Sequence, residues 1–457
     1  MGISTDGKPG EMTGAEIAGP EAAEPAPSGK RTNYRWMLAV FAMLMIFMNY
    51  VDRVNLAVAA PSIMKELHFT KVELGFLQTI FFLSYALFQI PSGTLVEFFG
   101  HRRVVPLSLA WWSLFTSLTA LCRSFGTWVV VRALFGIGES PAYPGLNAGI
   151  FNWFPKRERG RAVAIMLMGS KIGPVCGIPA ATLLMIQFGW RSVFWVFGGI
   201  GFFIAIGYYL MIRTYPHESR RVNQAELEHI ADGRPLAKPA QAKTLAPWSQ
   251  FLRSLQFWCV GGQLGTANFV QYVFIAWLPV YLLEAHHFSL KAMGFAAAIP
   301  EFAFAVGVVI CGLATDYVIG RKLANSKARA WFGGIGQLFC CFGLYLTAIS
   351  ETKGTTIFWL SIALAFLGFS MNSTWTSCSD LGGKFSGSVS GWTNFLGNLI
   401  GGMAPMVVAW VATGYGWRAA IMVTAVAGLV GATCWVFVRP DRPLKGSGQT
   451  AGDSAAA

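Results

Sequence analysis

One stretch of the sequence decides the fold, Val129-Val-Val-Arg132-Ala-Leu-Phe-Gly-Ile-Gly-Glu139-Ser-Pro-Ala-Tyr143, because it sets two opposite charges in an apolar run. Arg132 and Glu139 are seven residues apart, so we expect both side chains on one helix face, roughly 10 Å apart along the axis. An ion in the bilayer is costly unless it faces a protein interior or water. The pattern predicts a membrane helix whose charges line a cavity. The alternatives are a buried structural ion pair and a soluble helix that resembles a span.

The composition indicates a polytopic α-helical membrane protein. Of 457 residues, 54% are hydrophobic and 12% charged, and the mean hydropathy is +0.50. A soluble domain carries about 25% charged residues. The net charge of +13 does not predict nucleic-acid binding, because Lys and Arg collect in alternate short loops, which is the positive-inside pattern.

Windows of about 20 apolar residues predict an all-α membrane protein with twelve transmembrane helices in two six-helix halves. The predicted spans are 36–60, 74–97, 104–122, 127–150, 160–187 and 192–213, then 257–283, 293–319, 329–349, 355–378, 387–413 and 417–438. An even number of spans places both termini on one side of the membrane. The basic loops lie on that side, so we expect it to be the cytoplasm.

Five parts are predicted along the chain. They are an N-terminus at 1–34, a first half at 35–213, a cytoplasmic linker at 214–255, a second half at 256–439 and a cytoplasmic tail at 440–457. The N-terminus is rich in Gly, Ala, Glu and Pro, which is typical of disorder. It lacks the apolar core of a cleaved signal peptide, so the first span is expected to direct insertion.

The two halves repeat short motifs. Gly189-Trp190-Arg191 opens the sixth span, and Gly416-Trp417-Arg418 opens the twelfth at the same place in the second half. The loop after the second span carries Glu97, and the matching loop after the eighth carries Asp316. Secondary transporters are built from repeats of this kind, around a site between the halves.

Neither a metal site nor enzymatic chemistry is indicated. The eight cysteines lie within or beside apolar runs, and none has metal-ligand spacing with a histidine. The six histidines lie in loops or in the linker, so a nucleophile with a paired base is not expected. We therefore predict no metal, no cofactor and no enzyme activity.

These features resemble the major facilitator superfamily and, within it, the anion:cation symporter family of D-galactonate, hexuronate and glucarate proton symporters. Sialin-like and vesicular glutamate transporters are more distantly similar. The resemblance runs from about residue 35 to residue 439. It rests on Asn49-Tyr-Val-Asp52-Arg53, Tyr85-x-x-x-Gln89-Ile-Pro91, Gly138-Glu139-Ser-Pro-Ala, Trp153-Phe-Pro-x-x-Glu158-Arg159 and Gly391-Trp-Thr-Asn394-Phe-x-Gly397-Asn398.

The resemblance implies proton-coupled uptake of an organic anion by alternating access, with the proton as coupling ion. Two acids carry coupling in the galactonate symporter, and their matches are Asp52 and Glu139. Burial favours a protonated carboxyl, whereas Arg53 and Arg132 favour the charged form. The guanidinium fork matches a carboxylate, so both arginines are also candidate substrate ligands. The alternative is permanent pairing of the arginines with the two acids.

Five further positions match residues that the galactonate symporter uses for its polyol. They are Tyr85, Asn372, Trp375, Ser379 and Asn394. Hydroxyl and amide groups donate and accept hydrogen bonds, which suits a hydroxylated chain. Packing between helices is the alternative role for such residues.

Two charges depart from the galactonate pattern. Lys171 stands in span 5, where that symporter has a glutamine, and Glu301 stands in span 8, where an apolar residue is usual. We expect Lys171 to hold a second anionic group, with Glu301 as its partner in the empty state, which would favour a dicarboxylate. The alternatives are a fixed salt bridge between the halves and two unrelated charges. Glu301, Glu97 and Asp316 are possible charge partners or gate residues.

The leading hypothesis is therefore a monomeric importer of a sugar acid in a bacterial inner membrane. It is a multi-pass protein whose partners are an organic anion and the lipid bilayer. Uptake of aromatic carboxylates and exchange or efflux of organic anions are the alternatives within transport. Outside transport, the alternative is a membrane sensor on the same scaffold, which has no need of coupling acids.

Overall fold

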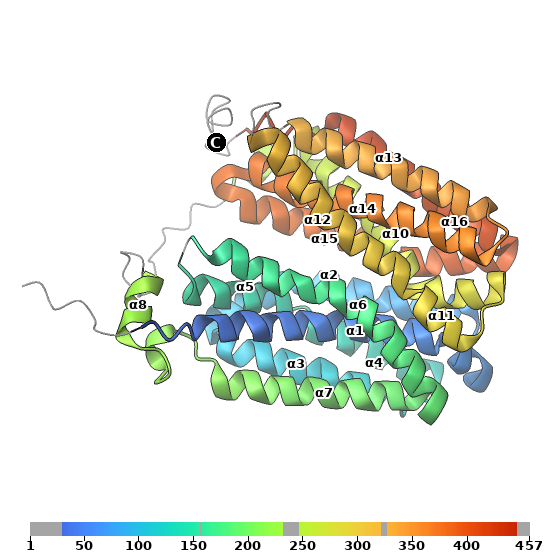
Figure 1. The fold of residues 1–457 in the computed structure, drawn as a ribbon, viewed down its shortest axis with the longest axis horizontal. Helices are drawn as coiled ribbons and strands as arrows, with labels where there is room; N and C mark the ends of the chain where they lie inside the picture. The colour runs from blue at the N-terminus through green and yellow to red at the C-terminus, as the bar shows by residue number, and fades with distance from the viewer. Residues whose placement is uncertain (1–29, 156, 232–245, 321–326, 446–457) are drawn as a thin grey trace, which may run out of the picture.

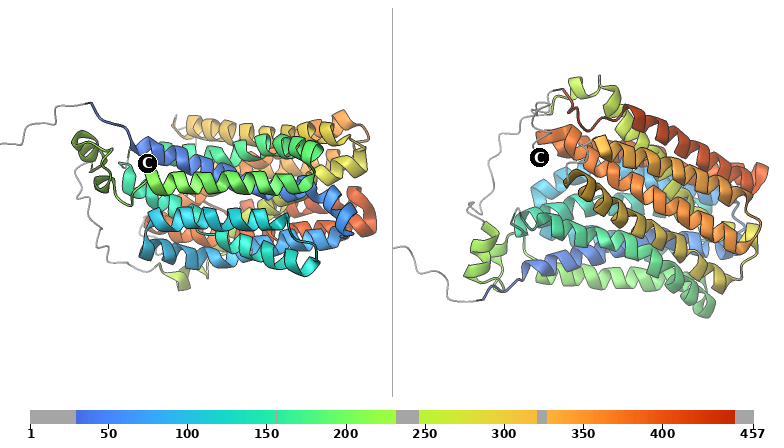
Figure 2. Two further views of the ribbon diagram at one scale, coloured as in Figure 1. Left: turned by 90° about the horizontal axis from the view of Figure 1, so that it is seen from below. Right: turned by 45° about the horizontal axis from the view of Figure 1, so that its top comes forward.

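The computed structural model describes residues 30–155, 157–231, 246–320 and 327–445. Within these ranges the regular structure is helical, and two groups of helices lie side by side (Figures 1 and 2). The first half comprises α1 (Arg35–Leu67), α2 (Lys71–Phe99), α3 (His101–Thr119), α4 (Phe125–Glu139), α5 (Ala142–Trp153), α6 (Arg159–Phe188) and α7 (Trp190–Met211). The second comprises α10 (Leu255–His286), α11 (Leu290–Ala296), α12 (Ala298–Gly320), α13 (Lys327–Ile349), α14 (Lys353–Gly382), α15 (Ser386–Gly401) and α16 (Ala404–Phe437). Between and beside them lie η1 (Pro216–Glu218), α8 (Gln224–Ala231), α9 (Trp248–Phe251) and η2 (Gly383–Phe385).

Each of the twelve predicted spans coincides with helix, but three of them are broken. The predicted span 127–150 divides into α4 and α5 at Pro141, because proline lacks the N–H that an unbroken helix needs. Pro300 follows the similar division of 293–319 into α11 and α12, and 387–413 divides between α15 and α16. Within the described residues, nine helical stretches are long and apolar enough to cross a membrane. The last of them, Ser386–Phe437, contains two predicted spans.

The repeated Gly-Trp-Arg motif builds the same turn in both halves. Gly189 (φ 79°) and Gly416 (φ 82°) adopt the positive φ that a side chain would make costly. The indole Nε1 of Trp190 donates to Glu66 at 2.7 Å, at the end of α1. The indole of Trp417 donates to Glu284 at 2.8 Å, at the end of α10. The repeat predicted from the sequence is therefore a structural repeat.

The turns that end α1 and α10 are also alike. His68 (φ 57°) and His287 (φ 50°) end these helices in the left-handed conformation, which non-glycine residues adopt uncommonly. Thr70 and Ser289 then begin the next helices, where each side chain accepts a backbone N–H. The connection between the first two helices of each half therefore has the same structure, a histidine in the left-handed conformation followed by a hydroxyl N-cap.

The two halves contact each other at the end of the bundle where these turns lie. Lys71 of α2 pairs with Glu284 of α10 at 2.6 Å. Gly75 packs so closely on α16 that a Cβ there would lie 2.7 Å from the carbonyl oxygen of Pro405. Further along α2, a Cβ at Gly93 would meet nothing within 4 Å. The contacts given by α2 to the other half thus concentrate at this end, and the ribbons diverge toward the end where α8 lies (Figure 1).

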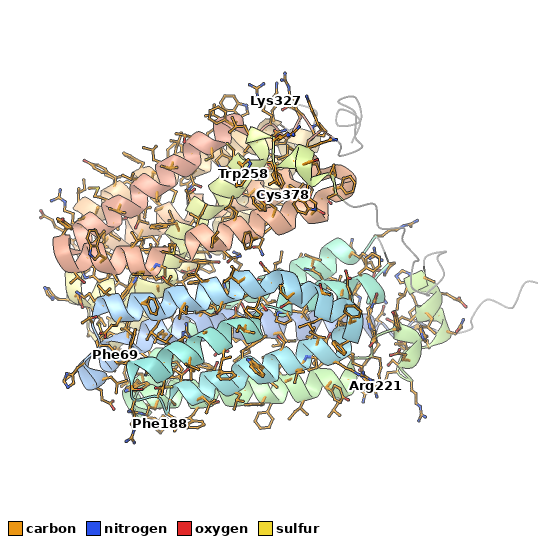
Figure 3. All side chains as sticks on the ribbon, turned by 180° about the vertical axis from the view of Figure 1, so that it is seen from behind. Phe69, Phe188, Arg221, Trp258, Lys327 and Cys378 are labelled. Atoms are coloured by element: carbon orange, nitrogen blue, oxygen red, sulfur yellow. The ribbon has the colours of Figure 1, made fainter. Side chains whose placement is uncertain are left out.

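Figure 3 marks the two ends of the bundle. Phe69 and Phe188 lie at the end where the halves meet, and Arg221 and Lys327 lie at the other. We call the latter the α8 end. At the α8 end of the first half, basic residues lie in the connections or in the first turns of the helices that follow them, at 102–103, 157–161 and 213–221. The charge asymmetry of the first half therefore follows the bundle axis.

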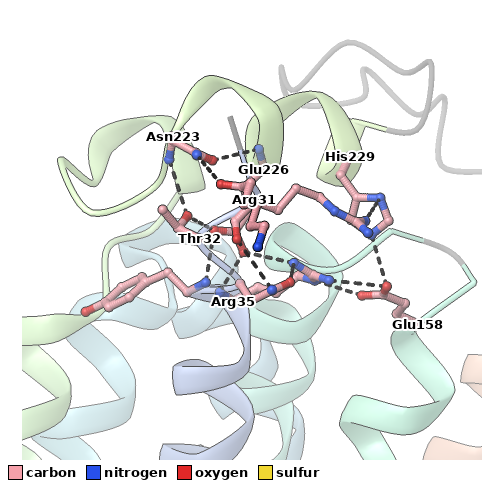
Figure 4. Close-up of polar contacts among 10 residues, drawn as sticks. Arg31, Thr32, Arg35, Glu158, Asn223, Glu226 and His229 are labelled. Atoms are coloured by element: carbon pink, nitrogen blue, oxygen red, sulfur yellow. Dashed lines mark hydrogen bonds and ion pairs between the residues drawn. The ribbon is translucent and has the colours of Figure 1, made fainter. Parts of the chain in front are cut away.

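At the α8 end, α8 binds the start of α1 (Figure 4). Tyr34, the N-cap of α1, gives no capping hydrogen bond from its side chain. Instead the buried carboxylate of Glu226 accepts the backbone N–H groups of Tyr34 (2.9 Å) and Arg35 (3.0 Å). The guanidinium of Arg35 joins Glu226 (3.0 Å) to Glu158 (2.7 Å), which also contacts His229 at 3.0 Å. A residue of the linker therefore caps the first membrane helix.

We expect Glu226→Ala to lower the free energy of unfolding by about 1–3 kcal/mol, because it removes this cap and a charged partner of Arg35. Burial raises the pKa of Glu226, but hydrogen bonds from Thr32, Arg35 and Tyr34 outweigh it and hold the pKa below its usual value. This stabilisation is present above the ordinary carboxyl pKa of about 4.3 and is lost as the pH falls through the folded value.

Thermal unfolding of the purified protein in detergent, at several pH values from 7 to 4, tests this expectation. The difference between wild type and Glu226→Ala should be largest at pH 7 and narrow toward pH 4. Glu228→Ala, on an exposed face of the same helix, is the matched control and should change stability by less than about 0.5 kcal/mol. Equal effects of the two variants would contradict the capping role.

Candidate functional site

Four buried charges lie together inside the first half. Asp52, Arg53 and Arg132 are each 2–3% exposed and Glu139 is 0% exposed. We call them the central cluster. Asp52 and Arg53 are neighbours on α1, so their side chains leave the helix about 100° apart. None of the four side chains faces outward, where it would contact lipid. Their positions are therefore compatible with a functional site.

The ion pair of the cluster joins Arg53 to Glu139. The guanidinium Nε lies 2.7 Å from Glu139 Oε1, and Nη2 donates to the same oxygen. The rings of Tyr50, Phe82 and Tyr85 lie 5.0–5.8 Å from the guanidinium carbon. Glu139 Oε2 has no hydrogen-bond partner, so one oxygen of this buried carboxylate remains available to a proton or to water.

Arg132 is not paired with an acid in the described structure. Its Nη2 donates to Gln78 at 3.2 Å, and its Nε has no partner. The rings of Phe81 and Phe135 each lie 5.0 Å from its guanidinium carbon. Permanent pairing of Arg132 with Glu139, one of the alternatives open from the sequence, is therefore not observed. A buried guanidinium with unused donors is suited to an anionic group that is bound transiently.

Asp52 faces α3 and lies in a set of polar groups that sequence reasoning missed. Its Oδ1 accepts from Asn55 at 3.1 Å, whereas its Oδ2 has no partner. The indole N–H of Trp112 and the hydroxyl of Thr116 face this carboxylate without a hydrogen bond of standard geometry. Trp112 and Thr116 are four residues apart on α3, and that spacing is the signal that could have revealed them.

Asn49 is a polar residue of α1 that lies beside Glu139. It is fully buried, one turn before Asp52, and faces Glu139, but neither of its amide atoms has a hydrogen bond of standard geometry. Buried polar groups are normally satisfied by protein or by ordered water. Asn49 therefore places a polar group without a partner beside Glu139, one helical turn from Asp52.

A chain of contacts leads from Arg53 to the second half. Phe82, beneath Arg53, stacks on Tyr272 of α10 with ring centroids 3.9 Å apart. The hydroxyl of Tyr272 donates to Asn398 at 2.6 Å, and the Asn398 amide donates to Asn394 at 3.1 Å. Of the predicted polyol ligands, Tyr85 (3% exposed) lies against Arg53 and Asn394 reaches the cluster through this chain.

The remaining predicted ligands lie apart from the cluster. Trp375 is 41% exposed and Ser379 lies one turn further along the same face of α14. Asn372 faces α12, where its amide nitrogen would lie 3.8 Å from a Cβ at Gly312. Glu97 is exposed near the end of α2. The side chain of Asp316 lies outside the described residues.

Lys171 and Glu301 lie where α6 of the first half meets α12 of the second. The ammonium of Lys171 lies 4.0 Å from the centre of the Phe304 ring. Glu301 is 5% exposed and acts electrostatically on Lys171. Within the described residues, no ion pair at 4.0 Å or less joins the two.

The second half has a neutral polar centre, which the sequence did not reveal. The Gln263 amide donates to Ser370 at 2.7 Å and accepts from Thr374 at 2.6 Å. Gln337 lies 3.4 Å from Gln263. All four side chains are fully buried. Among the described residues of the second half, Glu301 is the one buried charge, so the charged chemistry belongs mainly to the first half.

The described residues contain no group of three or more His, Cys, Asp or Glu placed to hold a metal ion. What they contain is two related six-helix halves that meet at one end, with buried charges of both signs beside the junction. This combination is the architecture of a secondary transporter.

The comparisons agree with this class and establish the family. A model described as Major Facilitator Superfamily matches residues 42–405, so the chain belongs to that superfamily. A bacterial homologue of the human lysosomal transporter Spinster, solved inward-facing and unoccupied, matches with a TM-score of 0.76 and 19% identity over 89% of this chain and 98% of that one. The fold is therefore the major facilitator fold, as the sequence predicted.

Curated relatives are transporters. The "Probable L-galactonate transporter" of Escherichia coli K12 is 31% identical over 407 residues, 87% of this chain and 88% of the relative. A "Probable galactarate/D-glucarate transporter" of the same strain is 30% identical over 84% and 88% of the two chains. The chloroplastic "Ascorbate transporter" of Arabidopsis thaliana is 26% identical over 88% and 74%. The protein is thus a multi-pass membrane transporter and not an enzyme.

Proposed function

We propose that the protein is a proton-coupled symporter that imports an organic anion by alternating access. We infer a sugar acid, such as a hexonate, a hexuronate or an aldarate, as the substrate. The observation that carries the proposal is the central cluster, in which two carboxylates and two guanidiniums are buried together. Relatives named for L-galactonate and for galactarate or D-glucarate support the choice of sugar acids.

Exchange of partners at Arg53 accounts for coupling. Arg53 holds Glu139 in the structure, and a substrate carboxylate competes for the same fork. When the substrate takes the guanidinium, Glu139 becomes a buried carboxylate without its counter-ion, which strongly favours protonation. Substrate and proton therefore bind together. Arg132, with unused donors, offers a second contact to the anion. Asp52 is the second proton carrier.

The hydroxyl groups of a sugar acid require donors and acceptors around the charged end. Tyr85 and Asn394 are best placed, because one lies against Arg53 and the other is linked to it through Tyr272. Asn372, Trp375 and Ser379 on α14 would reach the substrate only when the second half moves toward the cluster. We assign them to the substrate path in the closed state.

We assign the α8 end to the cytoplasm, because basic residues collect at that end and such loops stay inside. Both termini and α8 then lie in the cytoplasm of a bacterium whose inner membrane holds the protein. The contacts of Lys71, Glu284 and Gly75 then close the periplasmic end. This arrangement corresponds to the inward-facing state of an alternating-access cycle.

A thermal-shift screen of purified protein tests the function. The compounds are D-galactonate, L-galactonate, glucuronate, galactarate, D-glucarate, tartrate and benzoates. We expect stabilisation by one or more sugar acids, and we expect proteoliposomes to accumulate that compound when an inward proton gradient is imposed. Accumulation that ignores the gradient would contradict symport. A shift by benzoates alone would favour the second candidate, an aromatic carboxylate, for which the rings around Arg53 provide an apolar surface.

Exchange has less support. The one feature in its favour is the motif Gly173-Pro174-x-x-Gly177 in α6, which partly resembles a Gly-Pro motif of exchangers in this superfamily. A Cβ at Gly173 would lie 2.9 Å from the Phe47 carbonyl oxygen, and one at Gly177 would lie 3.0 Å from the Val51 side chain. Close packing of α6 on α1 therefore explains both glycines without a role in exchange.

A further inference from the structure

Lys171 and Glu301 form a pair of charges between the halves that the central cluster does not use. The ammonium of Lys171 makes no hydrogen bond of standard geometry and no ion pair within the described residues, and it rests on the Phe304 ring at 4.0 Å. Phe304 is 2% exposed and lies one turn after Glu301. Lys171 is half-buried, and its ammonium retains three donors that are free to bind an acceptor.

The separation of the two charges argues against a fixed bridge. Two ions buried for structural reasons are expected in direct contact, because only close contact with full hydrogen bonding offsets their desolvation. Here both charges are placed on facing helices, yet they stay more than 4.0 Å apart within the described structure. This is the geometry of a site into which a third charged group enters.

Lys171 lies at the level of the central cluster. Gly173, two residues further along α6, packs closely on α1, because a Cβ there would lie 2.9 Å from the Cβ of Tyr50. The Tyr50 ring in turn lies 5.1 Å from the guanidinium carbon of Arg53. Two helical residues rise about 3 Å, so α6 carries Lys171 past the central cluster at nearly the same depth, on the side that faces the second half.

We propose that Lys171 and Glu301 form a second anion subsite, in which Lys171 binds the distal carboxylate of a dianionic sugar acid whose first carboxylate lies on Arg53. The inference rests on the proposed function and narrows its substrate class to aldarates and similar dicarboxylates. Glu301 balances Lys171 when only a monoanion or no substrate is present, and the entering carboxylate replaces it as the partner of Lys171.

Galactarate and D-galactonate provide a matched test, because they share a carbon chain and differ in one terminal carboxylate. Proteoliposomes containing wild type are expected to bind galactarate more tightly than galactonate. Lys171→Gln should weaken galactarate binding by about tenfold to hundredfold, the loss of a charged hydrogen bond, and change galactonate binding by less than about twofold. Lys171→Arg should retain the preference. Lys291→Gln is the control, because Lys291 is an exposed lysine of α11 at the end where the halves meet. It should change the binding of neither acid.

The outcomes separate the inference from the function. Equal effects of Lys171→Gln on both acids, or none, would overturn the inference while leaving transport of sugar acids intact. Recovery of both activities in the double variant Lys171→Glu/Glu301→Lys, after equal losses in each single variant, would identify a structural bridge and also overturn it. A wild type that binds none of the sugar acids in the thermal-shift screen would overturn the proposed function and the inference together. Circular dichroism and thermal unfolding establish that each variant is folded.

Discussion

Glu139→Gln is expected to abolish accumulation of substrate against its gradient while exchange of substrate across the membrane continues. Glutamine keeps the size of the side chain and an acceptor for Arg53, which donates to Glu139 at 2.7 Å, but it cannot take up or release a proton. A carrier without this titrating group would still rock between its two faces with substrate bound, so the coupled step alone is lost.

The measurement is radiolabelled uptake into proteoliposomes, with and without an inward proton gradient, followed by counterflow with preloaded substrate. In the variant, uptake under the gradient should fall to the equilibrium level, and counterflow should stay within a few-fold of wild type. Glu351→Gln serves as the control, because Glu351 is an exposed acid in the connection between α13 and α14. This variant should accumulate substrate normally. Full accumulation by Glu139→Gln would remove this carboxyl from coupling.

Arg53→Lys should cause the second large effect, a loss of substrate affinity of about thirtyfold or more, equivalent to at least 2 kcal/mol. Lysine retains the charge but not the planar fork that donates two hydrogen bonds to a carboxylate. Lysine also lacks the flat contact that the guanidinium makes with the rings of Tyr50 and Tyr85, whose centres lie 5.1 and 5.0 Å from the guanidinium carbon. The affinity loss should appear for monoanions and dianions alike.

Binding of the substrate to detergent-solubilised protein, by calorimetry or by thermal shift, checks this expectation. Arg191→Lys is the matched control, because Arg191 pairs with Glu66 at 2.7 Å, at the end of α1. This variant should leave substrate affinity unchanged. An Arg53→Lys variant that is folded and binds substrate as wild type does would place the anion on Arg132 instead.

The fold could be predicted from the sequence because the bilayer imposes a length and a hydropathy that are visible in one dimension. The repeat of Gly189 and Gly416 was equally visible, since positive φ requires the same residue in both halves. The break at Pro141 could have been predicted, because the proline interrupts an apolar run. The division near Ala297 had a weaker signal, since Pro300 lies three residues beyond it.

Individual partnerships could not be predicted. Two arginines were available to Glu139, and the sequence did not distinguish between them, whereas the structure pairs Glu139 with Arg53, 86 residues away. The cap that Glu226 gives to α1 joins residues 191 apart, and no local pattern reports such a contact. Asn49 is easily taken for ordinary packing in an apolar helix, and its role follows only from what surrounds it in three dimensions.

The buried polar groups are distributed unequally between the two halves. Asp52, Arg53, Arg132 and Glu139 all belong to α1 and α4, whereas the centre of the second half is built from the amides and hydroxyls of residues such as Gln263 and Thr374. On the proposed mechanism, the first half carries the proton-coupling groups, and the second half mainly shapes the substrate cavity. Substitutions in α14 and α15 can therefore change substrate specificity during evolution while the coupling residues of α1 and α4 stay the same.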